Sequence, residues 1–355
     1  MPFFFSGGAP DPRRPVPYRG FPRSSFFFMK IAIVGCGALG SYYGARLCLA
    51  GHETHFLLRS DFEAVARLGV RVESDQPGET FAARPIAARK PEEIGPVDLI
   101  VVGLKTTANR RLRDWIPPLM NAATAVLTLQ NGLGNEELLA EIVRPEQVMG
   151  GLCFVSLNRI APGVIRHING GRILMGEFRG QPSDRTQRIA AVLRAAGIPC
   201  DLAENLGLAH WLKLVWNIAF NGLGVGSAAG YEAVVSGVVD SARPLDSCLT
   251  TDLLLADPAW RGLVRDVMLE VIEGACRLGF PIDPGYAQAE MERTLSMGIY
   301  RASTLVDFER GSPLELESLF LEPLQQARRA GAFLPRIEAL CQVLLALDTR
   351  RPRRA

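Results

Sequence analysis

Apolar positions along the chain follow two different patterns, one in each half. Between about residues 30 and 203, short apolar runs alternate with stretches in which apolar residues recur every three or four positions. The short runs are typical of buried strands, and the longer spacing is typical of amphipathic helices. Beyond Glu204 the short runs fade while the helical spacing continues. The pattern predicts an α/β domain with a doubly wound sheet, followed by a mostly α-helical domain.

The change of pattern predicts an α/β domain over 29–203 and a helical domain over 204–348. Strands are predicted at 31–34, 53–58, 97–105, 123–132, 148–155, 164–177 (broken at Asn169-Gly170-Gly171) and 199–202. Helices are predicted up to Gly51 and at 135–143, 184–196, 204–221, 260–278, 286–297, 299–310, 314–330 and 335–347. Residues 222–258, with scattered Gly, Ser, Pro and Asp, are predicted as a long irregular connection or lid.

The two ends of the chain differ in composition from the rest. Residues 1–28 are rich in Pro, Gly, Arg and Phe and show no period. They lack the continuous apolar core of a secretory signal, so we interpret them as a disordered extension or as sequence upstream of a true start at Met29. Residues 349–355 form a basic tail, which we expect to be solvated rather than a binding arm.

A glycine-rich turn follows the first predicted strand. Gly35, Gly37 and Gly40 have G-x-G-x-x-G spacing and lie between a strand and a helix. The first glycine permits the tight turn, the second lets the backbone approach a pyrophosphate, and the third lets helix and strand pack closely. The pyrophosphate then meets the N-terminus of the helix. The context indicates a Rossmann-type dinucleotide site whose contacts are Gly35, Cys36, Gly37, Ala38, Leu39 and Gly40.

The end of the second predicted strand selects between two cofactors. An NAD site carries Asp or Glu there, on the ribose 2′-OH, whereas this strand ends in Arg59. A guanidinium is suited to a 2′-phosphate, so the residue predicts NADPH. Two alternatives remain at this point: Arg59 ends the strand as a surface residue, or the nearby Asp61 serves NAD.

Two further strands end in polar residues. One ends in Lys105 and the next in Asn131-Gly132. Ligands of open α/β sheets bind beyond the carboxyl ends of the strands, so both side chains are predicted beside the nicotinamide. Alternatively, Lys105 is a solvated loop lysine and Asn131-Gly132 is an ordinary turn.

The stretch WLKLVWNIAFN, Trp211–Asn221, is apolar except for Lys213, Asn217 and Asn221. A helix that is apolar nearly all round is buried, and four-residue spacing places the three polar residues along one stripe. Buried amides need partners and a buried ammonium is costly, so the stripe predicts a ligand-binding cleft. Burial would also lower the lysine pKa, as a general acid requires. Alternatively, Lys213 extends to solvent and the asparagines pair with nearby backbone.

Near the C-terminus, the sequence STLVDFERGSPLELESL contains Ser303, Asp307 and Glu315. Gly311 is a typical helix stop. The run Ser312-Pro313-Leu314-Glu315 predicts a capping box with Pro at the first helical position. Glu315 therefore has a structural interpretation of its own, and Ser303 could equally be an ordinary helix residue.

Composition narrows the function further. The formal net charge of the 355 residues is +2, and the arginines at the two ends leave the middle slightly acidic, which argues against nucleic acid. The apolar runs are too short to span a membrane. The seven cysteines are scattered and none pairs as C-x-x-C, so we expect buried thiols in a reducing cytoplasm, with no zinc or other metal site.

Taken in order, these motifs resemble those of the 2-dehydropantoate 2-reductases, also called ketopantoate reductases. The resemblance runs from Met29 to about Leu347. It rests on the glycine turn, Arg59, Lys105, Gln130-Asn131-Gly132, the Lys213, Asn217 and Asn221 helix, and Ser303 with Glu315. It implies an N-terminal domain that binds NADPH, a helical domain that covers it, and a 2-keto acid in the cleft between them.

The resemblance also implies roles for the matching residues. It assigns the cofactor to the glycine turn, Arg59, Lys105 and Asn131, and the substrate to Asn131, Asn217, Asn221, Ser303 and Glu315. Lys213 would be the general acid. Ser303 would hold the substrate carboxylate, and Glu315 would bond its terminal hydroxyl.

The sequence therefore predicts NADPH-dependent reduction of a 2-keto acid, ketopantoate to pantoate in pantothenate and coenzyme A biosynthesis. The expected partner is this small molecule alone, and the enzyme is expected to be a cytoplasmic monomer or homodimer. Gly224 and Val225 replace residues that the family tends to have, which leaves another 2-keto acid as an alternative substrate. The sequence is also compatible with a dehydrogenase of the opine or hydroxyisobutyrate type and with a non-catalytic NADPH sensor.

Overall fold

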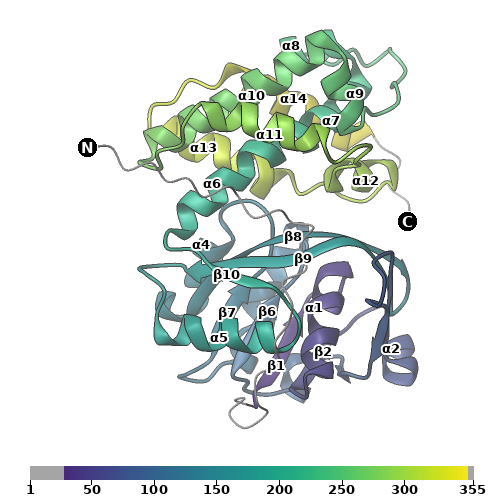
Figure 1. Ribbon diagram of the computed structural model, residues 1–355, viewed down its shortest axis with the longest axis vertical. Coiled ribbons are helices and arrows are strands. Elements are labelled where there is room, and N and C mark those ends of the chain that lie inside the picture. The colour runs from purple at the N-terminus through teal and green to yellow at the C-terminus, as the bar shows by residue number, and fades with distance from the viewer. Residues whose placement is uncertain (1–27, 351–355) are drawn as a thin grey trace.

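The computed structural model describes residues 28–350 in two parts stacked on one another (Figure 1). The part up to residue 205, here called the sheet domain, contains one large sheet with helices on both faces. The remainder, here called the helical domain, contains helices only among the described residues. The expectations for residues 1–28 and for the basic tail fall almost entirely outside the described residues. Arg350, assigned to that tail, is instead the last residue of a helix.

Ten strands of the described residues form the sheet. They are β1 (Lys30–Val34), β2 (Glu53–Leu57), β3 (Val70–Ser74), β4 (Phe81–Ala83), β5 (Ile86–Ala88), β6 (Leu99–Val102), β7 (Ala125–Thr128), β8 (Val148–Ala161), β9 (Val164–Glu177) and β10 (Cys200–Leu202). Their order is β4-β3-β9-β8-β7-β6-β1-β2-β5, with β10 beside β9. The run from β8 to β5 is parallel, whereas β8 pairs antiparallel with β9.

Helices cover both faces of the parallel strands. One face packs against α1 (Ala38–Leu49) and α5 (Asp184–Ala195), and the other against α3 (Leu112–Trp115) and α4 (Asn135–Ala140). The other helical segments of this domain are α2 (Phe62–Leu68), η1 (Pro91–Glu93), η2 (Thr106–Arg111), η3 (Pro117–Leu119) and η4 (Pro145–Gln147). Strands β6 and β7 are buried throughout, as sheets covered on both faces require. The predicted doubly wound Rossmann-type sheet is confirmed.

Strands β8 and β9 form a long hairpin, and one feature predicted for β9 from the sequence is wrong. The expected break at Asn169-Gly170-Gly171 does not end β9, which runs through it to Glu177. Register shifts in the pairing with β8 accommodate the two glycines, whose φ angles are +83° and +131°. The prediction of an interruption is wrong because irregular pairing absorbs positive-φ residues without ending a strand.

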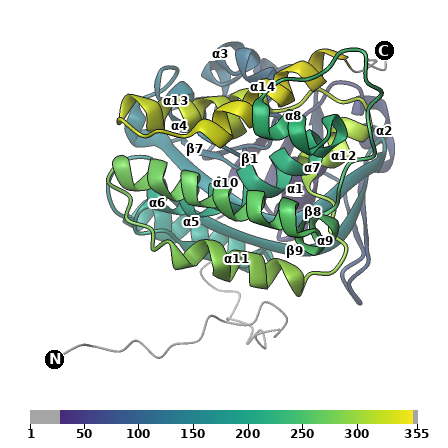
Figure 2. The ribbon, with the colours of Figure 1, turned by 90° about the horizontal axis from the view of Figure 1, so that it is seen from above.

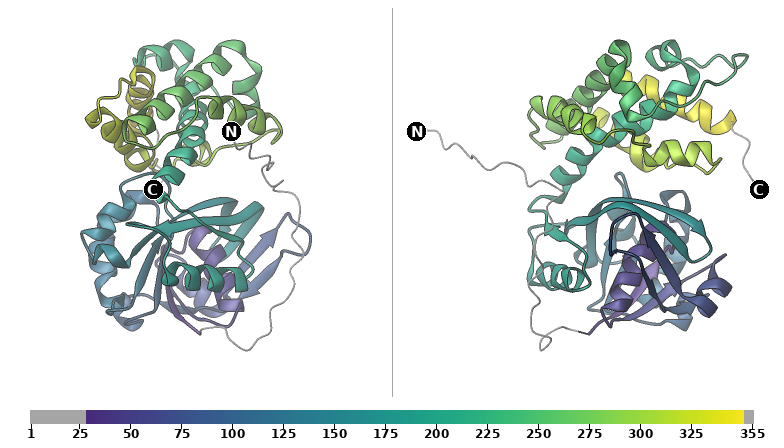
Figure 3. Two further views of the ribbon diagram at one scale, coloured as in Figure 1. Left: turned by 60° about the vertical axis from the view of Figure 1, so that its left-hand side comes forward. Right: turned by 45° about the vertical axis from the view of Figure 1, so that its right-hand side comes forward.

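The helical domain begins with α6 (Leu206–Asn217), which leads from the sheet domain into the second core (Figure 3). Its other segments are η5 (Ile218–Gly222), α7 (Leu223–Gly226), η6 (Ser227–Ala229), α8 (Tyr231–Ser236), α9 (Thr251–Ala256), α10 (Pro258–Arg277), α11 (Gly285–Leu295), α12 (Ser303–Glu309), η7 (Glu317–Leu321), α13 (Glu322–Arg329) and α14 (Pro335–Arg350). Helix α10 packs against α6, α13 and α14, and α11 lies beside it (Figure 2). No helix within 28–350 is long and apolar enough to cross a membrane.

Much of the predicted irregular connection at 222–258 is helical. Helices α7, α8 and α9 fall inside it, and irregular backbone is confined to about 237–250. The prediction failed because glycine lowers helix propensity, yet Leu223 and Val225 are fully buried in the helical core. Tertiary packing therefore outweighs the local preference.

The predicted capping box at 312–315 is also absent. Residues 312–315 are not helical, and the following π-helical turn η7 begins at Glu317. The Glu315 carboxylate accepts a hydrogen bond from the backbone N–H of Thr106 in the sheet domain instead of capping its own helix. A contact between domains has thus replaced the local motif.

Candidate active site

The carboxyl ends of β6 and β7 face the helical domain. Leu133, in the loop after β7, donates its N–H to the carbonyl of Ser318 at 2.9 Å. The Ser318 hydroxyl donates to that of Thr106, just beyond β6, at 3.0 Å. Ligands of open α/β sheets bind at this edge, so the junction of the two domains is the candidate site.

The glycine turn after β1 has the shape that a pyrophosphate requires. Gly35 has φ +99°, and a Cβ there would lie 2.3 Å from the backbone nitrogen of Leu104. A Cβ at Gly40 would lie 2.3 Å from the carbonyl oxygen of Gly35, whereas one at Gly37 would meet nothing within 4 Å. Among residues 28–350 no side chain caps the N-terminus of α1, and its first turn carries no acid. This open, uncapped end fits an anionic phosphate group.

Cys36 lies between the first two glycines. Its thiol donates to the carbonyl of Ile33 at 3.4 Å, and burial raises its pKa well above the usual value. The thiol therefore stays neutral and adds no negative charge to the phosphate site.

The two residues predicted to contact the ribose of a bound cofactor, Arg59 and Asp61, lie beyond β2. Arg59 is exposed and has no salt bridge within the described part of the chain. Asp61 is buried and accepts hydrogen bonds from the Arg159 guanidinium, the Gly163 N–H and the Ser60 hydroxyl. Burial alone would raise the pKa of Asp61, but the bonds from Arg159 and Ser60 lower it below its usual value. The carboxylate considered for NAD is thus already engaged, while Arg59 is accessible.

Lys213 on α6 reaches from the helical domain to the sheet domain. Its Nζ donates to Asn131 Oδ1 at 2.9 Å and to the carbonyl oxygen of Cys153 at 3.0 Å. The same nitrogen lies 5.5 Å from the centre of the Phe154 ring. Among the described residues no carboxylate forms a salt bridge with it. Burial lowers the pKa of Lys213, as expected for a general acid.

A polar network holds Asn131 from the sheet side. The Asn135 amide donates to the carbonyl of Asn131 at 3.1 Å, and the Asn109 amide donates to Asn135 Oδ1 at 3.1 Å. Gln130 donates to Asn109 Oδ1 at 2.6 Å and to the carbonyl of Leu104 at 2.7 Å. These hydrogen bonds therefore connect the loop after β6 with the loop after β7, which carries Asn131.

The predicted stripe on α6 divides at a π-helical turn. Asn217 ends α6 and is 9 % exposed, and no described hydrogen bond engages its amide. Asn221 lies in η5, where its Oδ1 accepts from the Ser303 hydroxyl at 3.2 Å and from the Thr304 N–H at 3.0 Å. Lys213 thus faces the β7–α4 loop, whereas Asn221 holds the start of α12. π-Helical turns occur frequently at functional sites.

Lys105 and Glu315 also connect the domains. The Lys105 ammonium lies 2.5 Å from the carboxylate of Asp307 on α12 and remains about half exposed. Glu315 Oε1 accepts from the Thr106 N–H at 2.7 Å, and burial raises the pKa of this carboxyl. Both side chains therefore lie at the junction where Lys213 and Asn131 meet.

Comparisons with known proteins identify the family of the chain. The family model described as Ketopantoate reductase PanE/ApbA matches residues 31–180, and the model of its C-terminal domain matches 233–348. The chain belongs to the ketopantoate reductase family. A 2-dehydropantoate 2-reductase of Nostoc sp. is 40 % identical over 326 residues, which span 90 % of this chain and 96 % of the relative.

Solved structures support the same assignment. The 2-dehydropantoate 2-reductase of Geobacter metallireducens is 43 % identical with a TM-score of 0.80, over 89 % of this chain and 99 % of that one. The enzyme of Methylococcus capsulatus is 30 % identical with a TM-score of 0.79, over 90 % and 97 %. A ketopantoate reductase fold therefore extends over both domains.

Sequence reasoning missed the groups that hold the predicted residues of this reductase fold in place. The carbonyl of Cys153 has no sequence signal because any residue supplies a carbonyl. Asn109 and Asn135 are isolated polar residues outside any motif. One feature of the sequence points to this network: Asn109 is a polar residue shortly after strand β6.

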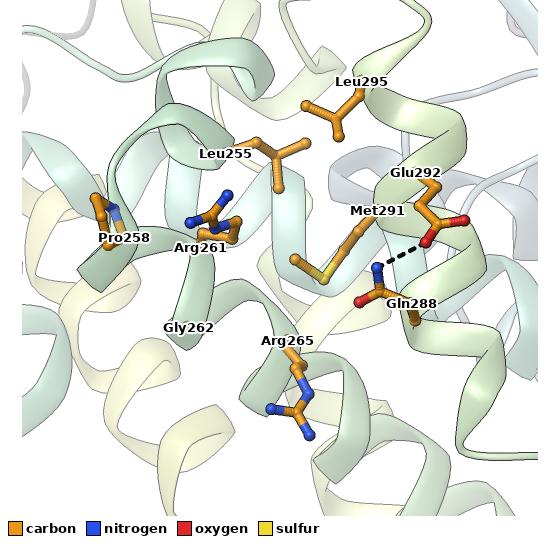
Figure 4. Close-up of a pocket in the computed structure, with 9 residues that line it drawn as sticks. All are labelled: Leu255, Pro258, Arg261, Gly262, Arg265, Gln288, Met291, Glu292 and Leu295. Carbon is orange, nitrogen blue, oxygen red and sulfur yellow. Dashed lines mark hydrogen bonds between the residues drawn. The ribbon is translucent and has the colours of Figure 1, made fainter.

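A separate pocket of about 370 Å³ lies on the surface of the helical domain, among α9, α10 and α11 (Figure 4). It has an apolar part formed by Leu255, Met291 and Leu295, and Arg261 and Arg265 come from α10. None of the predicted site residues lines it. Within the described part of the chain, no group of His, Cys, Asp or Glu could hold a metal ion.

Proposed function

We propose that this ketopantoate reductase reduces 2-dehydropantoate to pantoate with NADPH. One observation carries the proposal: the Lys213 ammonium lies at the domain junction and donates hydrogen bonds to the neutral oxygens of Asn131 and Cys153. A desolvated ammonium with no anionic partner among the described residues is suited to stabilise a developing alkoxide and to protonate it. The enzyme is proposed to act in the cytoplasm on a small molecule, as a monomer or homodimer.

The cofactor fits the open turn of the sheet domain. When bound, NADPH supplies the hydride that reduces the ketone carbon. The backbone N–H groups of residues 35–40 would hold the pyrophosphate, and Arg59 would pair with the 2′-phosphate. Lys105 and Asn131 would lie beside the nicotinamide, since each follows a strand that ends at the same edge.

Lys213 would supply the proton that completes the reduction. As the ketone carbon gains the hydride, its oxygen takes a proton from the ammonium and becomes the hydroxyl of the product. The lysine is left neutral and regains a proton from solvent. Asn131 and the carbonyl of Cys153 would keep the nitrogen in position, because both accept hydrogen bonds from it.

The remaining residues would orient the substrate. Ser303 is exposed at the first turn of α12 and would take the carboxylate, while Asn217 and Asn221 lie on the neighbouring helical segment. Glu315 Oε1 is engaged by Thr106, so its second oxygen would accept the terminal hydroxyl of the substrate. These contacts favour a 2-keto acid that carries a hydroxyl at its far end.

The proposal is tested by following NADPH oxidation with protein that begins at Met29. The panel should contain 2-dehydropantoate, its analogue without the terminal hydroxyl, pyruvate and phenylpyruvate. We expect the largest kcat/KM for 2-dehydropantoate. A preference for another 2-keto acid would redirect the substrate assignment, and NADPH binding without turnover on any of them would indicate a nucleotide sensor.

A further inference from the structure

A buried ionisable pair joins the two domains one helical turn before Lys213. His210 on α6 and Glu136 on α4 meet with Nε2 and Oε1 3.1 Å apart. Their side chains are only 8 % and 6 % exposed. Buried ionisable groups are costly unless paired, so this contact constrains how α6 lies against the sheet domain.

The sheet is shaped to admit the Glu136 carboxylate. A Cβ at Gly150 in β8 would lie 2.2 Å from Glu136 Oε1 and 2.7 Å from Leu206 Cδ2. Any side chain at position 150 would therefore displace the carboxylate or the first turn of α6. The glycine leaves room for the pair at the point where α6 begins.

The pair and the Lys213 contact attach α6 to the same segment of the sheet domain. His210 and Lys213 are three residues apart and share a face of α6. Their partners Glu136 and Asn131 belong to the continuous β7–α4 segment. Asn135, next to Glu136, donates to the carbonyl of Asn131. A shift at either contact would therefore be transmitted to the other.

We propose that Glu136 and His210 are positioning residues that hold Lys213 against Asn131 and the Cys153 carbonyl. The inference rests on the proposed role of Lys213 as proton donor. His210 Nε2 and Glu136 Oε1 lie within hydrogen-bonding distance, so removal of either partner removes this attachment of α6 to the sheet domain. A displacement of about 1 Å at a reacting group lowers the rate by about 100-fold, so a contact that prevents it matters for turnover.

The position of Lys213 can be followed through the pKa of its side chain, which distinguishes a displaced lysine from a general loss of stability. Burial lowers the pKa of Lys213. A lysine released from this position regains water, so its pKa returns upward. The Glu136–His210 pair is a second ionisable contact on this part of α6.

The test compares E136A, E136Q and E141Q. E136A removes the partner of His210, whereas E136Q keeps a polar amide at hydrogen-bonding distance from Nε2. E141Q is the matched control, because Glu141 at the end of α4 makes an exposed pair with Arg113. For each protein, kcat, the Kd of NADPH and the melting temperature are measured, together with the pH dependence of Lys213 acetylation by mass spectrometry of its peptide.

We expect E136A to lower kcat by about 10- to 100-fold with little change in the Kd of NADPH. The midpoint of Lys213 acetylation should move to higher pH. E136Q should recover most of kcat and the original midpoint, and E141Q should match the unaltered protein. A lower melting temperature in E136A with an unchanged midpoint and kcat would overturn the proposal, as would E136Q behaving like E136A.

The acetylation measurement separates this inference from the proposed function. Absence of reductase activity in the unaltered protein would contradict the function but leave the Lys213 midpoint measurable. A midpoint that is independent of Glu136 would contradict the inference even if the reductase activity is present.

Discussion

The Lys213 ammonium donates to two neutral oxygens and pairs with no carboxylate within the described residues. A carboxylate partner would hold the proton more tightly, whereas burial among neutral groups lowers the lysine pKa. The side chain is thus a stronger acid than a solvated lysine and remains able to donate two hydrogen bonds. Burial among neutral hydrogen-bond acceptors therefore determines both the acidity of Lys213 and the position of its ammonium group.

Replacing Lys213 tests this residue directly. We expect K213A to lower kcat by about 10²- to 10⁴-fold, the usual contribution of a general acid, with a smaller effect on NADPH affinity. Steady-state kinetics and a fluorescence titration of NADPH check the two parts. Unchanged turnover would refute the assignment.

The pH dependence of kcat gives a second test of the same residue. A general acid must be protonated, so kcat should fall as the pH rises through the Lys213 pKa. Because burial lowers that pKa, the fall should occur below the value of about 10.4 that is usual for lysine. A kcat profile that stays flat up to that value would contradict the lowered pKa.

The start of α1 and the start of α12 illustrate how elements are held at the site. Gly40 allows α1 to approach the turn, while Gly37 leaves space in front of the helix. Asn221, in the π-helical turn after α6, accepts the N–H of Thr304 and so fixes the first turn of α12. Close backbone approach at Gly40 attaches α1 to the glycine turn, and the buried amide of Asn221 attaches η5 to α12.

Two alanine substitutions in the glycine turn should behave differently. In G40A the added Cβ meets the Gly35 carbonyl at 2.3 Å, so we expect a loss of about 1–3 kcal/mol in the free energy of unfolding. In G37A the Cβ meets no atom of the described residues within 4 Å, so stability should be kept while NADPH affinity falls. Denaturant unfolding and NADPH titration of both proteins measure the contrast. Equal NADPH affinity in G37A and the unaltered protein would place the pyrophosphate elsewhere.

Asn221 should contribute to stability through α12. N221A leaves the buried Thr304 N–H without its acceptor, so we expect a loss of about 1–3 kcal/mol in unfolding free energy. S303A removes only the bond from an exposed hydroxyl and serves as the control. Chemical denaturation of both variants measures the difference, and equal stabilities would contradict this role.

The sequence was sufficient for elements whose signals are local. Short apolar runs located β1, β6 and β7, and the glycine spacing located the start of α1, because burial and turn geometry depend on neighbouring residues. Prediction from the sequence failed where contacts between residues far apart in the chain determine the local structure. Leu223 and Val225 make a glycine-rich segment helical by packing in the core, and Glu315 bonds Thr106 instead of capping a helix.

In the candidate site, too, the features set by local sequence were predictable and those set by distant contacts were not. The position of Asn131 at a strand end and of Lys213 in an apolar helix indicated a polar junction, and the structure brings the two within 2.9 Å. The π-helical turn was not predictable, because it depends on how Asn221 meets α12 rather than on residue spacing. Nor does a sequence mark the carbonyl of Cys153 as an acceptor.

At the scale of the whole molecule, the candidate site belongs to neither domain alone. The glycine turn, Arg59 and Asn131 come from the sheet domain, and Lys213, Ser303 and Glu315 from the residues beyond it. Contacts such as Glu315 to Thr106 and Ser318 to Leu133 hold the two parts together. A cofactor bound at this junction should therefore stabilise the folded molecule.

Thermal unfolding in the presence of nucleotide measures this coupling. NADPH at 100 times its Kd should add about 2.7 kcal/mol to the stability of the folded state, which raises the melting temperature. NADH at the same concentration should add less, because it lacks the phosphate that Arg59 would bind. In R59A the advantage of NADPH should disappear and the response to NADH should remain. Equal responses to both cofactors in the unaltered protein would contradict the role of Arg59.

The hydrogen bonds around Asp61 have a consequence for changing the coenzyme by protein engineering. Replacing Arg59 removes the group proposed to select the phosphate but introduces no acceptor for a free ribose hydroxyl. The carboxylate of Asp61 is held by Arg159, Ser60 and the Gly163 N–H, so it becomes available only when Arg159 is altered as well. We therefore expect conversion to NADH to require substitution of both Arg59, in the loop after β2, and Arg159 on β8, because neither change alone provides a free acceptor for the ribose hydroxyl.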